Sequence, residues 1–330
     1  MSDQAKRLRE LMRHIPKAAG AAVDNAAESI RWGAETEEVT GTPTIASVAM
    51  STVPALPLTS PARVIVVTSG KGGVGKTNIT VNLALALAKR EKRTVLFDAD
   101  LGMANVDVIL GVSPKAHLGD VIAGRKSLDD VLLPISDHLQ IVPGGSGIHE
   151  LADLDQDKLN GFIRQMAILE DRADFILVDT GAGISRGVLN FVLAAHEVLV
   201  VTTPEPTAIT DAYGLIKSID QHNPLAQVRL IINMAESEQE ARAVAQKLIM
   251  IVDRFLEIDV SFLTHIEKDP QVSRSVLQQQ PFFRAFPYGP STRRINMLAS
   301  LLIDPIESET PREAATGFFA RVAARVFGSH

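Results

Sequence analysis

One short glycine-rich stretch carries the residues best placed to do phosphate chemistry. It reads Gly70-Lys71-Gly72-Gly73-Val74-Gly75-Lys76-Thr77 and matches the pattern G-x-x-x-x-G-K-[ST]. Glycines let successive backbone N–H groups turn towards phosphate oxygens, while a lysine ammonium can reach the β- and γ-phosphates. The Thr77 hydroxyl can bind the Mg²⁺ that accompanies them, and Asn78 follows at the start of the next element. The stretch therefore predicts a nucleotide–Mg²⁺ site.

The elements on either side of this loop decide whether the match indicates a nucleotide-binding loop. Residues 64–68 form an apolar, β-branched run that predicts a buried strand, and Ile79, Leu83 and Leu87 recur afterwards at helical spacing. A strand, a glycine loop and a helix in this order are the context that the pattern requires. The alternative is a glycine-rich turn that matches by chance, and these flanking elements disfavour it.

Carboxylates follow two further predicted strands. Asp98 and Asp100 come at the end of the strand 93–97, and Asp179 ends the apolar run 175–178. Alternation along an extended chain points Asp98 and Asp100 the same way, so both can face the Mg²⁺–phosphate site and orient a water molecule. Asp179 has the form of a Walker B acid that holds the metal. Solvated acids at strand ends are the alternative interpretation.

Asn233 ends the apolar strand that contains residues 231 and 232. Its amide can both donate to and accept from an adenine edge, so we predict an adenine contact. An asparagine that merely starts a turn is the alternative.

Strands and helices alternate along the rest of the chain. Strands are predicted at 64–68, 93–97, 139–143, 174–179, 197–203, 228–233 and 259–265, and helices near 155–170, 185–195, 207–221, 236–255 and 270–280. This alternation predicts an α/β fold, a doubly wound and mainly parallel sheet flanked by helices. Ligands of such sheets bind at the carboxyl ends of the strands, where the motifs above cluster.

Composition excludes several functions. The chain has 330 residues, a net charge of −6 and no cysteine. The acidic balance argues against direct binding to bulk DNA, and the lack of cysteine excludes disulfides, thiolate metal sites and iron–sulfur clusters. No apolar run is long enough for a bilayer span, and the start of the chain lacks the apolar core of a signal peptide, so we expect a cytoplasmic protein.

The two ends differ from the domain predicted over residues 63–309. Residues 1–19 contain an amphipathic peptide expected to bind a partner, and residues 20–62 have the composition of a flexible linker. Residues 310–330 predict a C-terminal amphipathic helix suited to an anionic membrane surface. Its apolar stripe consists of Phe318, Phe319, Val322 and Val326. A helix docked on the protein's own core would show the same pattern.

Lys71 adds a second lysine to the loop, and K-G-G-x-G-K-T resembles the deviant Walker A motif of the MinD/ParA class of ATPases. The resemblance covers residues 63 to about 305. Within the class, residues 98–107 and 206–213 are similar to the flagellar-number regulators FlhG and FleN. Asp3-Gln4-Ala5-Lys6-Arg7-Leu8-Arg9 matches the D-Q-A-x-x-L-R motif by which FlhG activates the GTPase FlhF. The segment 265–269 departs from the class, which usually shows Ile-Pro there.

The resemblance implies an ATPase that forms a homodimer around two ATP molecules. Lys71 would act on the partner's phosphates, Lys76 and Thr77 would hold phosphate and Mg²⁺, and Asp100 would position the attacking water. The N-terminal residues expected to contact an FlhF-type GTPase are Asp3, Gln4, Ala5, Leu8 and Arg9. Further implied partners are flagellar C-ring proteins and, in some bacteria, a FleQ-type transcription activator. The ATP dimer would bind the inner face of the cell membrane reversibly, and hydrolysis would release the monomer.

Other functions are compatible with the same chemistry. A MinD or ParA ATPase that places the division site or segregates DNA would share these motifs. A nucleotide-gated scaffold with little hydrolysis would share them too. A metabolic P-loop enzyme is disfavoured, because the sequence shows no substrate-binding constellation beyond the nucleotide site.

Overall fold

The computed structural model of the chain describes residues 62–100, 105–145, 156–195, 197–303 and 317–327. The chain divides into two units, residues 1–55 and 56–330, and every described residue lies in the second. The predicted partner-binding peptide and nearly all of the predicted linker lie outside the described residues. The roles given to Asp3, Gln4, Ala5, Leu8 and Arg9 therefore stay predictions.

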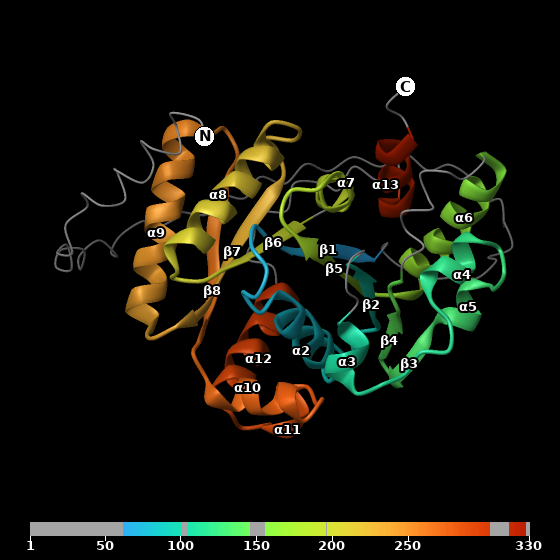
Figure 1. Cartoon of the computed structure of the whole chain (residues 1–330), viewed down its shortest axis with the longest axis horizontal. Coiled ribbons are helices and arrows are strands. Elements are labelled where there is room, and N and C mark those ends of the chain that lie inside the picture. The colour runs from blue at the N-terminus through green and yellow to red at the C-terminus, as the bar shows by residue number, and fades with distance from the viewer. Residues whose placement is uncertain (1–61, 101–104, 146–155, 196, 304–316, 328–330) are drawn as a thin grey trace, which may run out of the picture. The chain divides into compact units, whose positions relative to one another are not determined.

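An eight-stranded sheet forms the centre of the second unit, in the order β3-β4-β2-β5-β1-β6-β7-β8 (Figure 1). Neighbouring strands are parallel throughout, except for the antiparallel pair β3–β4. The strands are β1 (Arg63–Ser69), β2 (Thr94–Ala99), β3 (Leu133–Ser136), β4 (Leu139–Val142), β5 (Phe175–Ala182), β6 (Glu197–Thr202), β7 (Gln227–Ala235) and β8 (Val260–Glu267). The predicted α/β fold with a mainly parallel sheet is confirmed.

Helices cover both faces of this sheet. They are α2 (Lys76–Ala88), α3 (Val106–Leu110), α4 (Leu118–Ile122), α5 (Leu128–Val131), α6 (Gln156–Arg172), α7 (Arg186–Ala194), α8 (Pro206–Asp220), α9 (Glu238–Phe255), α10 (Pro270–Leu277), α11 (Phe282–Ala285), α12 (Pro290–Ile303) and α13 (Phe318–Phe327). Figure 1 shows α2 and α10–α12 on one side of the sheet, and α7, α8 and α13 on the other. The P-loop helix α2 is thus enclosed between the sheet and α12.

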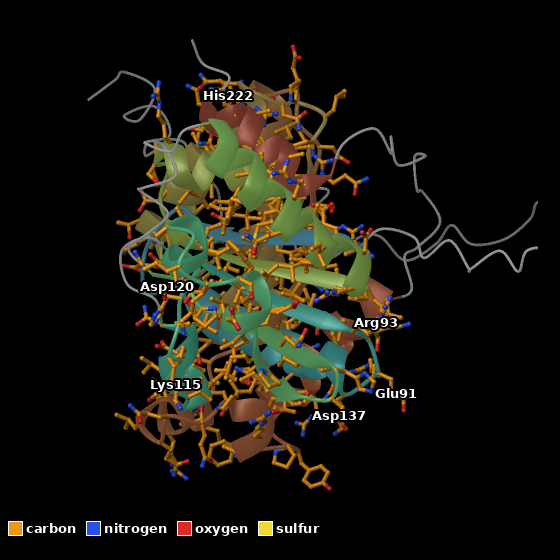
Figure 2. All side chains as sticks on the ribbon, turned by 90° about the vertical axis from the view of Figure 1, so that its right-hand side faces the viewer. Glu91, Arg93, Lys115, Asp120, Asp137 and His222 are labelled. Carbon is orange, nitrogen blue, oxygen red and sulfur yellow. The ribbon has the colours of Figure 1, made fainter. Side chains whose placement is uncertain are left out.

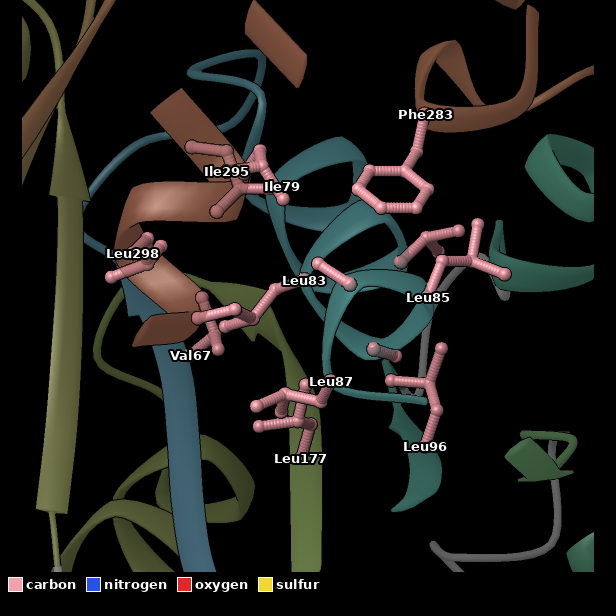
Figure 3. Packing of buried hydrophobic residues seen from close by; sticks show 14 of the residues in the cluster. Val67, Ile79, Leu83, Leu85, Leu87, Leu96, Leu177, Phe283, Ile295 and Leu298 are labelled. Atoms are coloured by element: carbon pink, nitrogen blue, oxygen red, sulfur yellow. The ribbon is translucent and has the colours of Figure 1, made fainter. Parts of the chain in front are cut away.

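Close packing around α2 fixes the position of the P-loop. Ile79, Leu83 and Leu87 are at most 1% exposed and belong to the core cluster that joins α2 to the strands and to α12 (Figure 3). Parallel strands that are buried on both faces are apolar along their whole length, which explains why runs such as residues 64–67 were readable as strands. The loop before α2 is therefore anchored at both ends.

Six of the described elements were not predicted from the sequence, namely β3, the short helices α3, α4, α5 and α11, and the longer helix α12. Strand β3 is only four residues long and contains Pro134, which suits an edge strand but gives little pattern to recognise. Helix α12 does carry a helical pattern, since its buried residues include Ile295, Leu298, Ala299 and Leu302. Its apolar spacing was available in the sequence and would have revealed it.

Helix α13 is docked on the chain's own core. Phe318, Phe319 and Val322 are 0%, 3% and 6% exposed, and α13 packs on α6 and α7. The side chain of Val326 is outside what the structure describes. In this conformation the stripe predicted for a membrane faces the protein, so contact with lipid requires α13 to leave its place. Within the described part of the chain, no helix combines the length and apolarity needed to cross a bilayer.

Candidate functional site

The P-loop presents its backbone at the carboxyl end of β1. Gly73 and Gly75 have φ angles of 81° and 87°, in the left-handed region that suits glycine. Gly75 precedes α2 and provides no side-chain cap, so the first N–H groups of the helix remain available to a ligand. A loop of this shape at a helix N-terminus favours an anion such as a phosphate.

Lys76 and Thr77 converge on Asp179 at the end of β5. The Lys76 ammonium lies 2.9 Å from Asp179 Oδ1, and the Thr77 hydroxyl donates to Asp179 Oδ2 at 2.8 Å. Thr80, one helical turn further along α2, also donates to Asp179 Oδ1, at 3.0 Å. Lys76 and Asp179 are 7% and 1% exposed, so this is a buried ion pair. The ammonium is held where the phosphates and metal of a nucleotide would meet.

Asp98 completes this end of the site. Asp98 and Asp179 are direct neighbours in the pairing of β2 with β5, although 81 positions separate them in the chain. Burial, and next the negative charge of Asp179, raise the pKa of Asp98 to about 7. Two buried carboxylates beside a threonine hydroxyl are the oxygen ligands that Mg²⁺ prefers. The donor set therefore fits a Mg²⁺–phosphate group.

Asp100 lies just beyond the end of β2, and its predicted role towards water stays a prediction. Strand β2 ends at Ala99, so strict alternation does not extend to Asp100. Its backbone N–H donates to Asp98 Oδ1 at 3.1 Å, and a Cβ built on Gly181 would lie 3.3 Å from its carboxylate. Asp100 thus sits against the carboxyl end of β5, next to the predicted metal ligands.

The Lys71 side chain extends from the P-loop to the start of α8. Its ammonium contacts Glu205 Oε2 at 2.9 Å and Thr207 Oγ1 at 2.8 Å, at the start of α8. The Lys71 ion pair lowers the pKa of Glu205. The Lys71 and Glu205 side chains are 35% and 57% exposed, so water screens the pair and a phosphate can displace it at little cost.

Asn233 closes the other side of the P-loop. Its Nδ2 donates to the Val74 carbonyl at 2.7 Å, and a Cβ on Gly75 would lie 2.4 Å from the same nitrogen. The predicted adenine contact is thus within reach of the loop, while one of its donors already binds loop backbone. Its role towards adenine stays a prediction.

Gly70 has a reason for its identity that the motif alone does not reveal. A Cβ there would lie 2.2 Å from the carbonyl of Asp211 and 2.6 Å from the nitrogen of Ala212, both backbone atoms of α8. By contrast, a Cβ on Gly72 would meet nothing within 4 Å. The first glycine of the motif therefore allows α8 to pack against the loop.

Three residues with contacts in the site were given no individual role by the sequence interpretation, although the stretch 203–207 was predicted to be a loop at the ligand side. They are Thr80, Glu205 and Thr207. Thr80 lies four residues after Lys76 on the same face of α2, which is a readable signal. The other two are brought to Lys71 by the fold, across more than 130 positions of sequence.

A separate hollow of about 600 Å³ lies at the opposite edge of the sheet. Arg93, Asp137, His138 and Arg172 are among its lining residues, and Figure 2 shows Arg93 and Asp137 there. It lies where strand β2 begins, whereas ligands of doubly wound sheets bind where strands end. We assign it no part in nucleotide binding.

Comparison with known proteins identifies the family. Residues 65–282 match the CobQ/CobB/MinD/ParA nucleotide binding domain. The chain is 47% identical over 227 residues to the antiactivator FleN of Pseudomonas aeruginosa, covering 69% of this chain and 81% of FleN. The chain belongs to the MinD/ParA family. Within it, the chain belongs to the FlhG/FleN group and is a P-loop ATPase, as the sequence predicted.

Other relatives agree with this placement. The flagellum site-determining protein YlxH of Helicobacter pylori is 34% identical over 265 residues, covering 79% of this chain and 89% of YlxH. The MinC:MinD cell division complex of Aquifex aeolicus matches with a TM-score of 0.59 and 30% identity, over 76% of this chain and 99% of that chain. MinD of Pyrococcus horikoshii, solved with Mg-ADP, matches with a TM-score of 0.59 and 28% identity, over 73% of this chain and 96% of that chain.

Proposed function

We propose that this ATPase is an ATP-dependent dimerising switch that regulates the number or placement of flagella. The observation that carries the proposal is the position of Lys71, whose ammonium contacts Glu205 and Thr207 at the start of α8. A lysine held at the exposed start of α8 is available to the phosphates of a second subunit, because its own ion pair is weak. The similarity to FleN and to the flagellum site-determining protein YlxH supports the flagellar role.

The residues of one subunit have separate tasks in this mechanism. Backbone N–H groups from residues 70–78 bind the phosphates, and Lys76 turns from Asp179 to the β- and γ-phosphates. Thr77, Asp98 and Asp179 would hold Mg²⁺, which would supply positive charge where negative charge develops. Asp100 orients the attacking water, and Lys71 of the second subunit stabilises the transferring phosphoryl group.

The switch also has proposed partners. Residues 3–9 stimulate an FlhF-type GTPase, and the ATP dimer is recognised by flagellar C-ring proteins or a FleQ-type transcription activator. In the dimer, α13 leaves its place on α6 and α7 and binds the inner face of the cell membrane, and hydrolysis returns the monomer to the cytoplasm. The amphipathic pattern of α13 supports this membrane step.

Size-exclusion chromatography with light scattering tests the switch directly. With ADP the protein should elute as a 35.6 kDa monomer, and with ATP at twice that mass. Asp100→Ala should retain the dimer for longer, because water activation is lost. Lys71→Ala should bind ATP but remain monomeric, and its unfolding free energy should change by less than about 1 kcal/mol because the exposed ion pair is weak.

Other outcomes would count against the proposal. A monomer with ATP bound in every variant would remove the role of Lys71 across an interface. A dimer that Lys71→Ala forms as readily as the wild type would do the same. If the wild type dimerises with ATP but cells that carry the monomeric Lys71→Ala variant have the normal number of flagella, the dimer does not serve the proposed purpose.

A further inference from the structure

The end of β7 contains an irregularity beside the P-loop. The pairing with β8 passes from Asn233–Ile266 to Ala235–Glu267 and skips Met234. Met234 has a φ of 57°, a left-handed backbone that only two other non-glycine residues of the described chain adopt. An extra residue of this kind is a β-bulge, which re-aims a side chain and is frequent next to active sites. The bulge therefore gives Met234 a direction that a regular strand would not.

The bulge brings an apolar side chain to the surface. Met234 is 42% exposed, whereas Asn233 and Ala235 on either side are 8% and 0% exposed. Its terminal methyl group lies close to the P-loop, because a Cβ built on Gly75 would be 3.6 Å from it. A left-handed backbone at a non-glycine residue is unfavourable for the isolated chain, and its position beside the P-loop points to a ligand.

The topology indicates which part of a nucleotide lies here. Asp98 and Asp179 are on β2 and β5, on one side of β1, and they mark the Mg²⁺ and γ-phosphate end. Strand β7 lies on the other side of β1, beyond β6. A nucleotide whose phosphates occupy the P-loop and whose γ-phosphate faces Asp179 must extend its base away from that end. The end of β7 is in this direction.

We propose that Met234 is the platform on which the purine base of the bound nucleotide stacks. A polarisable thioether makes favourable contacts with an aromatic ring, and an unbranched side chain adapts to the plane of the base. The neighbouring Asn233 amide then reads the edge of the base while Met234 covers its face. This inference rests on the nucleotide site of the proposed function and adds to it the residue that binds the base.

Oxidation by hydrogen peroxide provides a test within the wild-type protein. Peroxide transfers one oxygen atom to an exposed thioether sulfur and is reduced to water. Met250 on α9 and Met297 on α12 are 57% and 49% exposed and serve as internal controls. Mass spectrometry should show that saturating ADP or ATP slows oxidation of Met234 several-fold and leaves the two controls unchanged.

A binding measurement with Met234→Gly separates the side chain from the backbone. Glycine adopts a positive φ without strain, so this variant should unfold at the same temperature as the wild type or higher. Its affinity for ADP and ATP should fall about 3- to 10-fold, because the stacking contact is lost. Binding of inorganic tripolyphosphate, which has no base, should be unchanged.

Glu91→Gly is the matched control. Glu91 also has a left-handed backbone, with a φ of 59°, but it lies at the opposite end of α2 from the P-loop and close to Arg93 (Figure 2). The same relief of strain there should leave nucleotide affinity unaltered.

Three results would overturn the inference. Equal oxidation of Met234 with and without bound nucleotide would show that the base leaves it uncovered. Wild-type affinity in Met234→Gly, or an equal loss for tripolyphosphate, would assign Met234 to another task. If the wild type binds tripolyphosphate but no nucleotide, or neither, the nucleotide site itself fails, which is distinguishable from failure of the stacking contact alone.

Discussion

At the scale of single residues, Asp98 and Asp179 are the two carboxylates of the proposed Mg²⁺ site. The two carboxylates are neighbours in the sheet, and each is 1% exposed. Lys76, Thr77 and Thr80 satisfy Asp179, whereas the pKa of Asp98 is raised to about 7. Without metal, the raised pKa therefore favours the protonated, neutral form of the Asp98 carboxyl beside the charged Asp179. Binding of Mg²⁺ with nucleotide would reverse this, because a dication stabilises both carboxylates.

The raised pKa predicts how pH changes the stability of the metal-free protein. The folded chain holds the Asp98 proton more tightly than the unfolded chain, whose carboxyl has a pKa of about 3.8. The stability from this group is therefore fully present below about pH 4 and is lost as pH rises to about 7. In EDTA at pH 8, the free energy of unfolding of Asp98→Asn should be higher than that of the wild type by roughly 1–3 kcal/mol.

The same comparison at low pH is its control. At pH 5 the advantage of Asp98→Asn should shrink, because the wild-type carboxyl is then protonated. Urea unfolding at both pH values measures the difference. A gap between the two proteins that is independent of pH would contradict the assignment.

At the scale of elements, α8 packs directly on the P-loop, and this contact joins two parts of the proposed switch. Gly70 lies against the backbone of α8, and the start of that helix provides Glu205 and Thr207 to Lys71. A displacement of the loop on binding phosphate must therefore be felt by α8, since close-packed backbones have no free space to absorb it. We therefore expect the loop and α8 to move together.

Gly70→Ala tests this contact. A Cβ 2.2 Å from a backbone carbonyl forces α8 and the loop apart, so we expect a loss of about 1–3 kcal/mol in the free energy of unfolding. Gly72→Ala is the matched control, because its Cβ meets nothing within 4 Å and the stability should hardly change. Equal stability of both variants would show that the close approach of α8 has no energetic importance.

At the scale of the whole molecule, α13 is held by a polar and an apolar contact. The Glu170 carboxylate accepts from the N–H groups of Phe318 and Phe319 at 3.0 and 3.1 Å, and so caps the helix. The two phenylalanines also pack in an aromatic group with Phe97 and Phe191. Release of α13 to a membrane must break the cap and expose these rings. Membrane binding is thus opposed by the folded monomer itself.

Vesicle flotation tests this opposition. Anionic lipid vesicles should carry the wild type upwards with ATP and hardly with ADP. Glu170→Gln weakens the cap by about 1 kcal/mol, so it should increase flotation in the ADP state several-fold. Asp171→Asn removes an exposed charge from the adjacent position and should behave as the wild type. Unchanged flotation of Glu170→Gln with ADP would contradict a restraining role for Glu170.

The sequence by itself determined the phosphate loop, the fold class and most strands. These depend on neighbouring residues: a phosphate cradle is built from one contiguous loop, and strands buried on both faces must be apolar along their length. Only the tertiary structure decided that Asp98 adjoins Asp179, that Lys71 pairs with Glu205, and that Phe318 faces the core. Such contacts join distant positions, and an apolar helical stripe has the same pattern whether lipid or protein covers it.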